Sequence, residues 1–144
     1  MFFDAHSDIW CDVTTRRLRG ETDILRKHHL PRLRKGGVEG SILVIWVDPP
    51  YDKDYVKRTQ QIMTCVDAEV KECDEIQIVH TYDEMMQANK AGKIYIFKGI
   101  EGLAAIGEDL SKIDKYYDFG CRHAMLTWNE ANALGAGALS GQSY

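Results

Sequence analysis

A histidine and a carboxylate close the first apolar stretch of this chain. In the opening segment "MFFDAHSDIW", His6 and Asp8 follow a short run of apolar residues. If that run is a β-strand, residues two positions apart project from the same face, so the imidazole and the carboxylate converge on one point. A divalent metal such as zinc takes this mixture of nitrogen and oxygen donors. The alternative is a hydrogen-bonded polar pair at a strand end, and two residues alone do not decide between them.

Further polar side chains follow two later apolar runs. Glu101 lies in "KGIEG", directly after an apolar segment, and the glycine beside it lets the backbone approach closely. Taken alone, Glu101 would be a surface carboxylate. In parallel α/β barrels, however, functional groups collect at the carboxyl ends of several strands, which makes Glu101 a third donor. A carboxylate placed between two metal ions can hold them about 3.5–4 Å apart. The last apolar run continues into Trp128, Asn129, Glu130 and Asn132.

The hydrophobic pattern predicts the elements that would position these groups. Short apolar runs indicate strands near residues 2–6, 41–47, 93–99 and 122–128. Amphipathic segments indicate helices within residues 21–37, 52–73, 81–93 and 107–122. Thr81 with Glu84 three residues later forms a capping box at the start of one of them. Alternation of strands and helices predicts an α/β fold, with a parallel sheet and helices outside it.

The composition is that of one globular domain. The chain has 144 residues, 44% of them hydrophobic and 28% charged, and a net charge of −4. No secretory signal is visible, and the longest apolar run, Ile42–Val47, is too short to span a bilayer. We therefore expect a cytoplasmic protein that does not bind membranes. We expect its four cysteines, which lack zinc-finger spacing, to be reduced: Cys11, Cys65, Cys73 and Cys121.

A basic segment interrupts this acidic background. Between Thr14 and Gly37 there are eight Lys/Arg residues against Glu21 and Asp23. Such a segment can bind nucleic acid, but here it lacks interleaved aromatic residues. We favour a solvated helix face or a surface that packs on an acidic neighbour, and we expect no nucleic-acid partner.

The other histidines are weaker candidates for chemistry. We expect His28 and His29 to be exposed and His80 to lie in a loop before a helix. We expect His123, at the start of the fourth strand, to be packed or hydrogen-bonded. None of them has the spacing of a metal ligand.

Three segments together resemble a known family. The start "FFDAHSDIW" resembles the D-G-H-x-D start of the membrane (renal) dipeptidase family, which are zinc-dependent peptidases of the amidohydrolase type. The segment "LPRLRKGGVEGSILVIWV" resembles the next block of that family. The segment "IFKGIEGLAAIGEDLSKIDKYYDFGCRHAMLTWNEAN" resembles a longer block with an E-G, a helix and then G-x-R-x-x-x-L-T. The "LTWN" form is similar to a bacterial branch.

The resemblance implies a function and a site. His6 and Asp8 would be the first-strand ligands of a two-zinc site, and Glu101 would be the bridging carboxylate. Zinc would be the cofactor and a dipeptide the substrate. Trp128 and Asn132 would contact that substrate, although many relatives have a histidine where this chain has Trp128. An indole donates a hydrogen bond but cannot ligate a metal.

The resemblance also implies that residues 1–144 are the N-terminal half of a TIM-type (β/α)8 barrel. Such a barrel has eight strands and needs more than about 200 residues, and the family's last two metal ligands are histidines on later strands. We therefore expect this chain to be inactive or nearly so, and to self-associate or pair with a missing C-terminal half. The alternative is a truncated, non-catalytic remnant that acts as a structural or interaction module.

Overall fold

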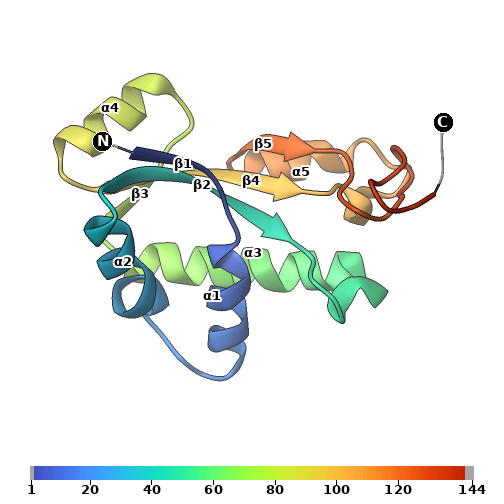
Figure 1. Ribbon diagram of the computed structural model, residues 1–144, viewed down its shortest axis with the longest axis horizontal. Helices are drawn as coiled ribbons and strands as arrows, with labels where there is room; N and C mark the ends of the chain where they lie inside the picture. Colours follow the sequence, from blue (N-terminus) through green and yellow to red (C-terminus); the bar gives the residue numbers. More distant parts are fainter. Residues whose placement is uncertain (1, 142–144) are drawn as a thin grey trace.

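Strands built from the predicted apolar runs form the centre of the molecule (Figure 1). The computed structural model describes residues 2–141. None of the helices in that range is long and apolar enough to cross a bilayer. In chain order the elements are β1 Phe2–Ser7, α1 Ile9–Leu18, the π-helix η1 Leu25–His29, α2 Leu30–Lys35, β2 Val38–Trp46, the 3-10 helix η2 Tyr51–Lys53, α3 Tyr55–Glu72, β3 Ile76–Ile78, α4 Tyr82–Lys90, β4 Ile94–Glu101, the 3-10 helix η3 Ala104–Ile106, α5 Lys112–Asp118 and β5 Cys121–Met125.

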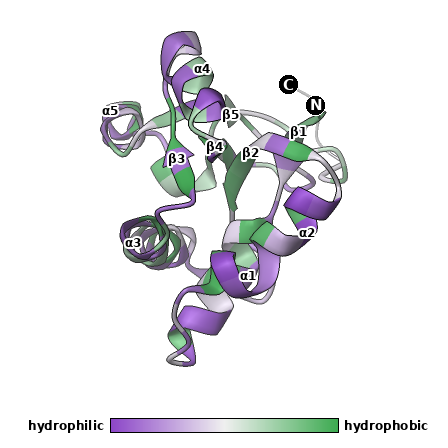
Figure 2. Cartoon of the chain, turned by 90° about the vertical axis from the view of Figure 1, so that its left-hand side faces the viewer, coloured by the Kyte–Doolittle hydropathy of each residue, from purple (hydrophilic) through white to green (hydrophobic). Residues whose placement is uncertain are grey.

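All strand pairs in the sheet are parallel, as predicted. β2 lies between β1 and β4. The edge of β4 that faces away from β2 pairs with two strands. Residues 94–96 of β4 pair with β3, and residues 98–101 of β4 pair with β5. Figure 2 shows the helices arranged in an arc around these strands. The carboxyl ends of β1, β2, β4 and β5 therefore lie at one edge, where the sequence predicted the chemistry.

Some predicted boundaries were wrong. The short strand β3 and the helix α1 were not predicted, because a three-residue strand has too little periodicity to detect and α1 follows β1 after a single residue. The predicted strand 122–128 ends at Met125, since residues beyond it turn into a loop. The capping box was correct: the Thr81 hydroxyl accepts a hydrogen bond from the Glu84 backbone N–H at 3.2 Å.

The core lies between the sheet and the helices α1 and α3. β-branched and leucine side chains on one face of β2 and β4 are buried against one face of each helix. Trp10 and Val13 of α1 and Ile62 and Val66 of α3 are all fully buried there. Because α1 begins directly after β1, this packing also fixes where the end of β1 lies.

Ion pairs join α1 and the following segment to α3. Arg17 donates to Glu69 at 2.7 Å and to Glu72 at 2.8 Å. Glu69 is fully buried and also accepts from the Leu25 backbone N–H at 2.6 Å. Hydrogen bonding from Arg17 lowers the pKa of Glu72 to about 2. The basic segment thus packs on an acidic neighbour, which is one of the two favoured interpretations.

Replacing Glu69 with alanine tests how much these ion pairs between α1 and α3 stabilise the fold. Glu69→Ala leaves the buried Leu25 N–H without its acceptor, while Arg17 keeps Glu72, so we expect a loss of about 1–3 kcal/mol in the free energy of unfolding. Urea denaturation measures it. The control is Asp74→Ala, which removes an exposed partner of Arg26 and should have little effect. Equal losses in the two variants would contradict a special role for Glu69.

Candidate metal centre

Three polar side chains meet at the carboxyl-end edge of the sheet. His6 Nε2 lies 3.1 Å from Glu101 Oε2 and 3.7 Å from Asp8 Oδ1. One ligand atom from each residue lies within 4.8 Å of the others. The structure therefore brings together the three residues that the sequence indicated as metal donors, although β1 and β4 are not adjacent in the sheet.

An irregularity in β1 directs His6 toward β4. The register of β1 against β2 shifts between Asp4 and Ser7, so His6 lies at an interruption of the ladder. The Asp4 carboxylate accepts a hydrogen bond from the His6 backbone N–H at 3.2 Å. Irregularities of this kind change the direction of a side chain near a strand end. Here the result is an imidazole that reaches across β2 to Glu101.

Asp8 reaches the cluster by a different route from the predicted one. It does not belong to the strand but occupies the N-cap position of α1, with φ −89° and ψ 21°. Its side chain makes no capping hydrogen bond, while its carbonyl oxygen accepts from the Cys11 N–H at 2.8 Å. The carboxylate is therefore free to face His6, and the positive end of the helix dipole favours its charge.

Glu101 is the buried member of the cluster. It is the last residue of β4, and its side chain is 8% exposed, against 42% for His6 and 49% for Asp8. Burial raises the pKa of Glu101, because the charged form loses water. The charge on His6 opposes this shift, and the charges on Asp8 and Glu130 add to it. A cation at this place would stabilise the ionised carboxylate.

The chemistry of these donors fits a divalent metal. One imidazole and two carboxylates from two separate strand ends are the ligand types that zinc takes in proteins. His6 would bind through Nε2, the atom that now faces Glu101. Because a metal ion needs the unprotonated imidazole nitrogen, zinc binding should weaken at low pH.

The two residues predicted to contact substrate lie in the loop after β5. The Trp128 ring packs edge-on against Trp46, with centroids 5.0 Å apart, and remains partly exposed. Asn132 uses its side chain within the loop: Nδ2 donates to the Leu126 carbonyl and Oδ1 accepts from the Leu134 N–H. The Asn132 side chain thus stabilises the loop through hydrogen bonds, while the Trp128 and Trp46 rings pack together as one aromatic surface. Their contact with a substrate stays a prediction.

Within the described residues, no other histidine joins the group of His6, Asp8 and Glu101. His29 was expected to be exposed, but its side chain is 15% exposed and pairs with Asp12 at 2.9 Å. Burial lowers the pKa of His29. His80 lies before α4, as predicted, and pairs with Glu84. His123 packs over Gly99, and its Nδ1 is buried without a hydrogen bond from residues 2–141.

One further residue of the region, Glu130, was not predicted as a site residue from the sequence. Glu130 lies 3.7 Å from the position that a Cβ on Gly102 would occupy, next to Glu101. Its charge also raises the pKa of Tyr55, after the larger effect of burial. Glu130 was among the polar residues found after the last apolar run, but nothing in the spacing separated it from its neighbours, so it was not predicted as a site residue.

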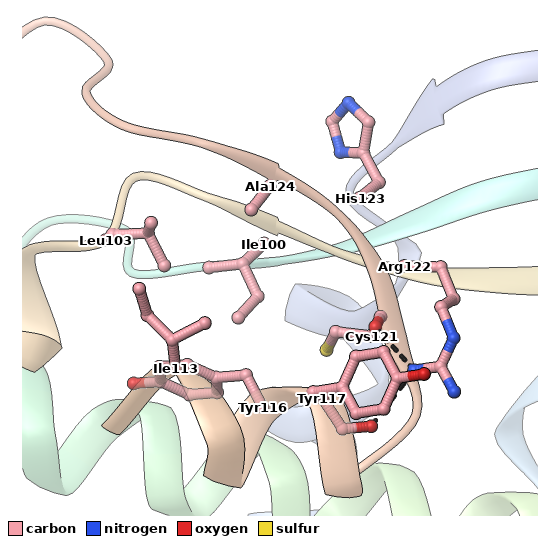
Figure 3. A pocket seen from close by; sticks show the side chains of 9 residues that line it. All are labelled: Ile100, Leu103, Ile113, Tyr116, Tyr117, Cys121, Arg122, His123 and Ala124. Carbon is pink, nitrogen blue, oxygen red and sulfur yellow. Dashed lines mark hydrogen bonds between the residues drawn. The ribbon is translucent and has the colours of Figure 1, made fainter. Parts of the chain in front are cut away.

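An apolar pocket of about 250 Å³ lies between β5 and α5 (Figure 3). Ile100, Leu103, Ile113 and Tyr116 line it, and Cys121 points into it. The His123 imidazole projects to the other side of β5. The pocket is therefore separate from the cluster of His6, Asp8 and Glu101.

Solved structures share this fold. The dipeptidase AC, a metallo peptidase of family M19, has 20% sequence identity and a TM-score of 0.80, over 94% of this chain and 45% of that chain. A Rhodobacter sphaeroides metallo peptidase, liganded with a phosphinate mimic of L-Ala-D-Ala, has 18% identity and a TM-score of 0.76, over 94% and 47%. A Pseudomonas aeruginosa amidohydrolase has 18% identity and a TM-score of 0.65, over 74% and 32%. The chain thus spans under half the length of these structures, and its fold matches part of the barrel of M19 dipeptidases.

The sequence itself assigns the family. No curated protein sequence matches the chain significantly. A sequence model described as membrane dipeptidase (Peptidase family M19) matches all of residues 1–144. The family is one of metal-dependent dipeptidases, which agrees with the donor cluster at the end of the sheet. The chain therefore belongs to the membrane dipeptidase family, peptidase family M19.

Proposed function

We propose that this chain carries the first part of a two-zinc centre, and that the complete barrel hydrolyses the peptide bond of dipeptides. The observation that carries the proposal is the convergence of His6, Asp8 and Glu101 within 4.8 Å at the carboxyl-end edge of the sheet. The family match over the whole chain supports it.

Each of the three residues has a distinct part in this proposal. His6 and Asp8 hold one side of the centre, from the end of β1 and the start of α1. Glu101 holds the other side from β4, and its burial places a negative charge where water cannot screen it well. A zinc ion held by these residues would activate a nucleophile at neutral pH and would stabilise the negative charge that develops on the substrate carbonyl oxygen. Trp128 and Trp46 form the wall beside which a dipeptide side chain would lie.

Metal binding is the first test of the centre. Titration calorimetry of the metal-free chain with zinc should show binding at the cluster. His6→Ala should raise the Kd by about 100-fold or more, because a ligand contributes more than the 10–100-fold of an outer-shell partner. The matched control is His28→Ala, which removes an exposed histidine that faces Glu21. Equal affinities of the wild-type chain and His6→Ala would refute the assignment.

We expect the 144-residue chain to have little activity of its own. Three donors can hold one metal ion, but they leave the second without enough ligands for a catalytic geometry. Incubated with zinc and an alanyl dipeptide, the chain should release no more free alanine than its Glu101→Gln variant. Zinc-dependent hydrolysis well above that variant would show that the half-site is sufficient.

We also propose that the chain associates with itself or with a further part of the barrel. Leu110, Ile113, Tyr117 and Leu126 are exposed around α5 and the end of β5. Within residues 2–141, β5 pairs with β4 alone, so it presents an open strand edge beside this apolar surface. Sedimentation velocity should therefore show dimers or larger species at micromolar concentration. A stable monomer over a wide concentration range would contradict this proposal.

A non-catalytic module is the second candidate, and the same exposed apolar surface favours it. The coding DNA after Tyr144 separates the two. An in-frame continuation with two more histidines at strand ends supports the enzyme. A stop codon at that point, together with a chain that binds no zinc, supports the module.

A further inference from the structure

Backbone hydrogen bonds hold the loop that contains Glu130 next to the end of β4, where Glu101 lies. Beyond β5, the Gly102 and Leu103 N–H groups donate to the carbonyls of Met125 and Leu126 at 3.2 and 3.1 Å. These two bonds extend the β4–β5 pairing past Glu101. The chain after β5 therefore runs alongside the residues that follow Glu101.

The rest of the loop closes back on itself. The Ala138 N–H donates to the Trp128 carbonyl and the Leu139 N–H donates to the Asn129 carbonyl, both at 2.8 Å. Gly137 lies so close to the Glu130 backbone that a Cβ there would overlap the Glu130 carbonyl. These contacts hold the loop backbone close to Glu130, so the point from which its side chain extends is set by the loop.

The Glu130 carboxylate has no evident partner within the part of the chain that the structure describes. It makes no hydrogen bond or ion pair among residues 2–141, although it is only partly exposed. One of its oxygens lies 3.7 Å from the Cβ position of Gly102. Gly102 directly follows Glu101 in the chain, so the Glu130 carboxylate lies beside the end of β4. The carboxylates of Asp8 and Glu101 face the His6 imidazole, and the Glu130 carboxylate lies beside Gly102, the residue after Glu101.

We propose that Glu130 is a further carboxylate of the cation site, and that it raises the affinity of the His6–Asp8–Glu101 cluster for divalent cations. The proposal rests on the proposed metal centre and deepens it. Glu130 lies outside the group of three whose ligand atoms fall within 4.8 Å of one another. It is therefore a positioning residue that acts through its charge on the cation and on Glu101.

A partly exposed carboxylate beside the proposed cation site favours binding of a cation there through its negative charge. Two carboxylates with like charge repel each other, and a divalent cation between them reverses the sign of that interaction. The energy is larger at a half-buried place than at the surface, since less water screens it. This gives Glu130 an effect on cation affinity that a purely structural loop residue would not have.

Three variants of the 144-residue chain test this role. Glu130→Gln removes the charge and keeps the shape, Glu130→Asp keeps the charge, and Glu108→Gln is the control at an exposed glutamate. Calorimetric titration with zinc alone, at low and high salt, gives the Kd of each. Urea denaturation of the metal-free proteins reports their stability.

We expect Glu130→Gln to raise the Kd for zinc by about tenfold at low salt. The difference in Kd from the wild type should be smaller at high salt, because salt screens the charge of Glu130. Glu130→Asp should stay within about threefold of the wild-type Kd, Glu108→Gln should be unchanged, and metal-free stability should be equal in all four proteins.

Wild-type affinity in Glu130→Gln would overturn the role of Glu130 and leave the metal centre standing. Equal weakening in Glu130→Gln and Glu130→Asp with lost stability would also overturn it, in favour of a structural role. A wild-type chain that binds no zinc would overturn both proposals.

Discussion

The contact between His6 and Glu101 is the interaction on which the rest of this site depends. Glu101 is a carboxylate buried at the end of a central strand, and such a group needs a positive charge or hydrogen-bond donor beside it. In the structure that partner is His6, which lies 3.1 Å away and comes from a strand that is not adjacent to β4. In the proposed metal-bound state the cation takes this place, and the imidazole becomes a ligand in its own right.

The packing of the helices holds the residues around this contact in place. Asp8 takes its position from α1, and α1 is held against α3 by the buried faces of both helices and by Arg17 on Glu69. The stability of the basic segment is thus linked to the site through one short helix. On the other side, β4 carries Glu101 and its pairing with β5 places the loop that contains Glu130. Both halves of the site are built from elements that begin or end at the same edge.

Much of this architecture could be predicted from the sequence, for physical reasons. Continuous β-branched runs such as the one in β2 need a buried sheet, and a parallel sheet brings its strand ends together, which predicted the meeting of His6 with Glu101. Local details could not be predicted. The irregularity that turns His6 and the N-cap position of Asp8 depend on tertiary packing, and so does the pairing of His29 with Asp12 of α1. The place of Glu130 beside Gly102 could not be predicted, because it depends on loop hydrogen bonds between distant residues, which leave no periodic signal.

The most direct test of the account is an anomalous-scattering map at the zinc absorption edge, from crystals of the wild-type chain grown with zinc. The account predicts a peak bounded by His6 Nε2 and the carboxylates of Asp8 and Glu101. Zinc bound only elsewhere, for instance between His29 and Asp12, or no peak at the cluster at saturating zinc, would contradict it.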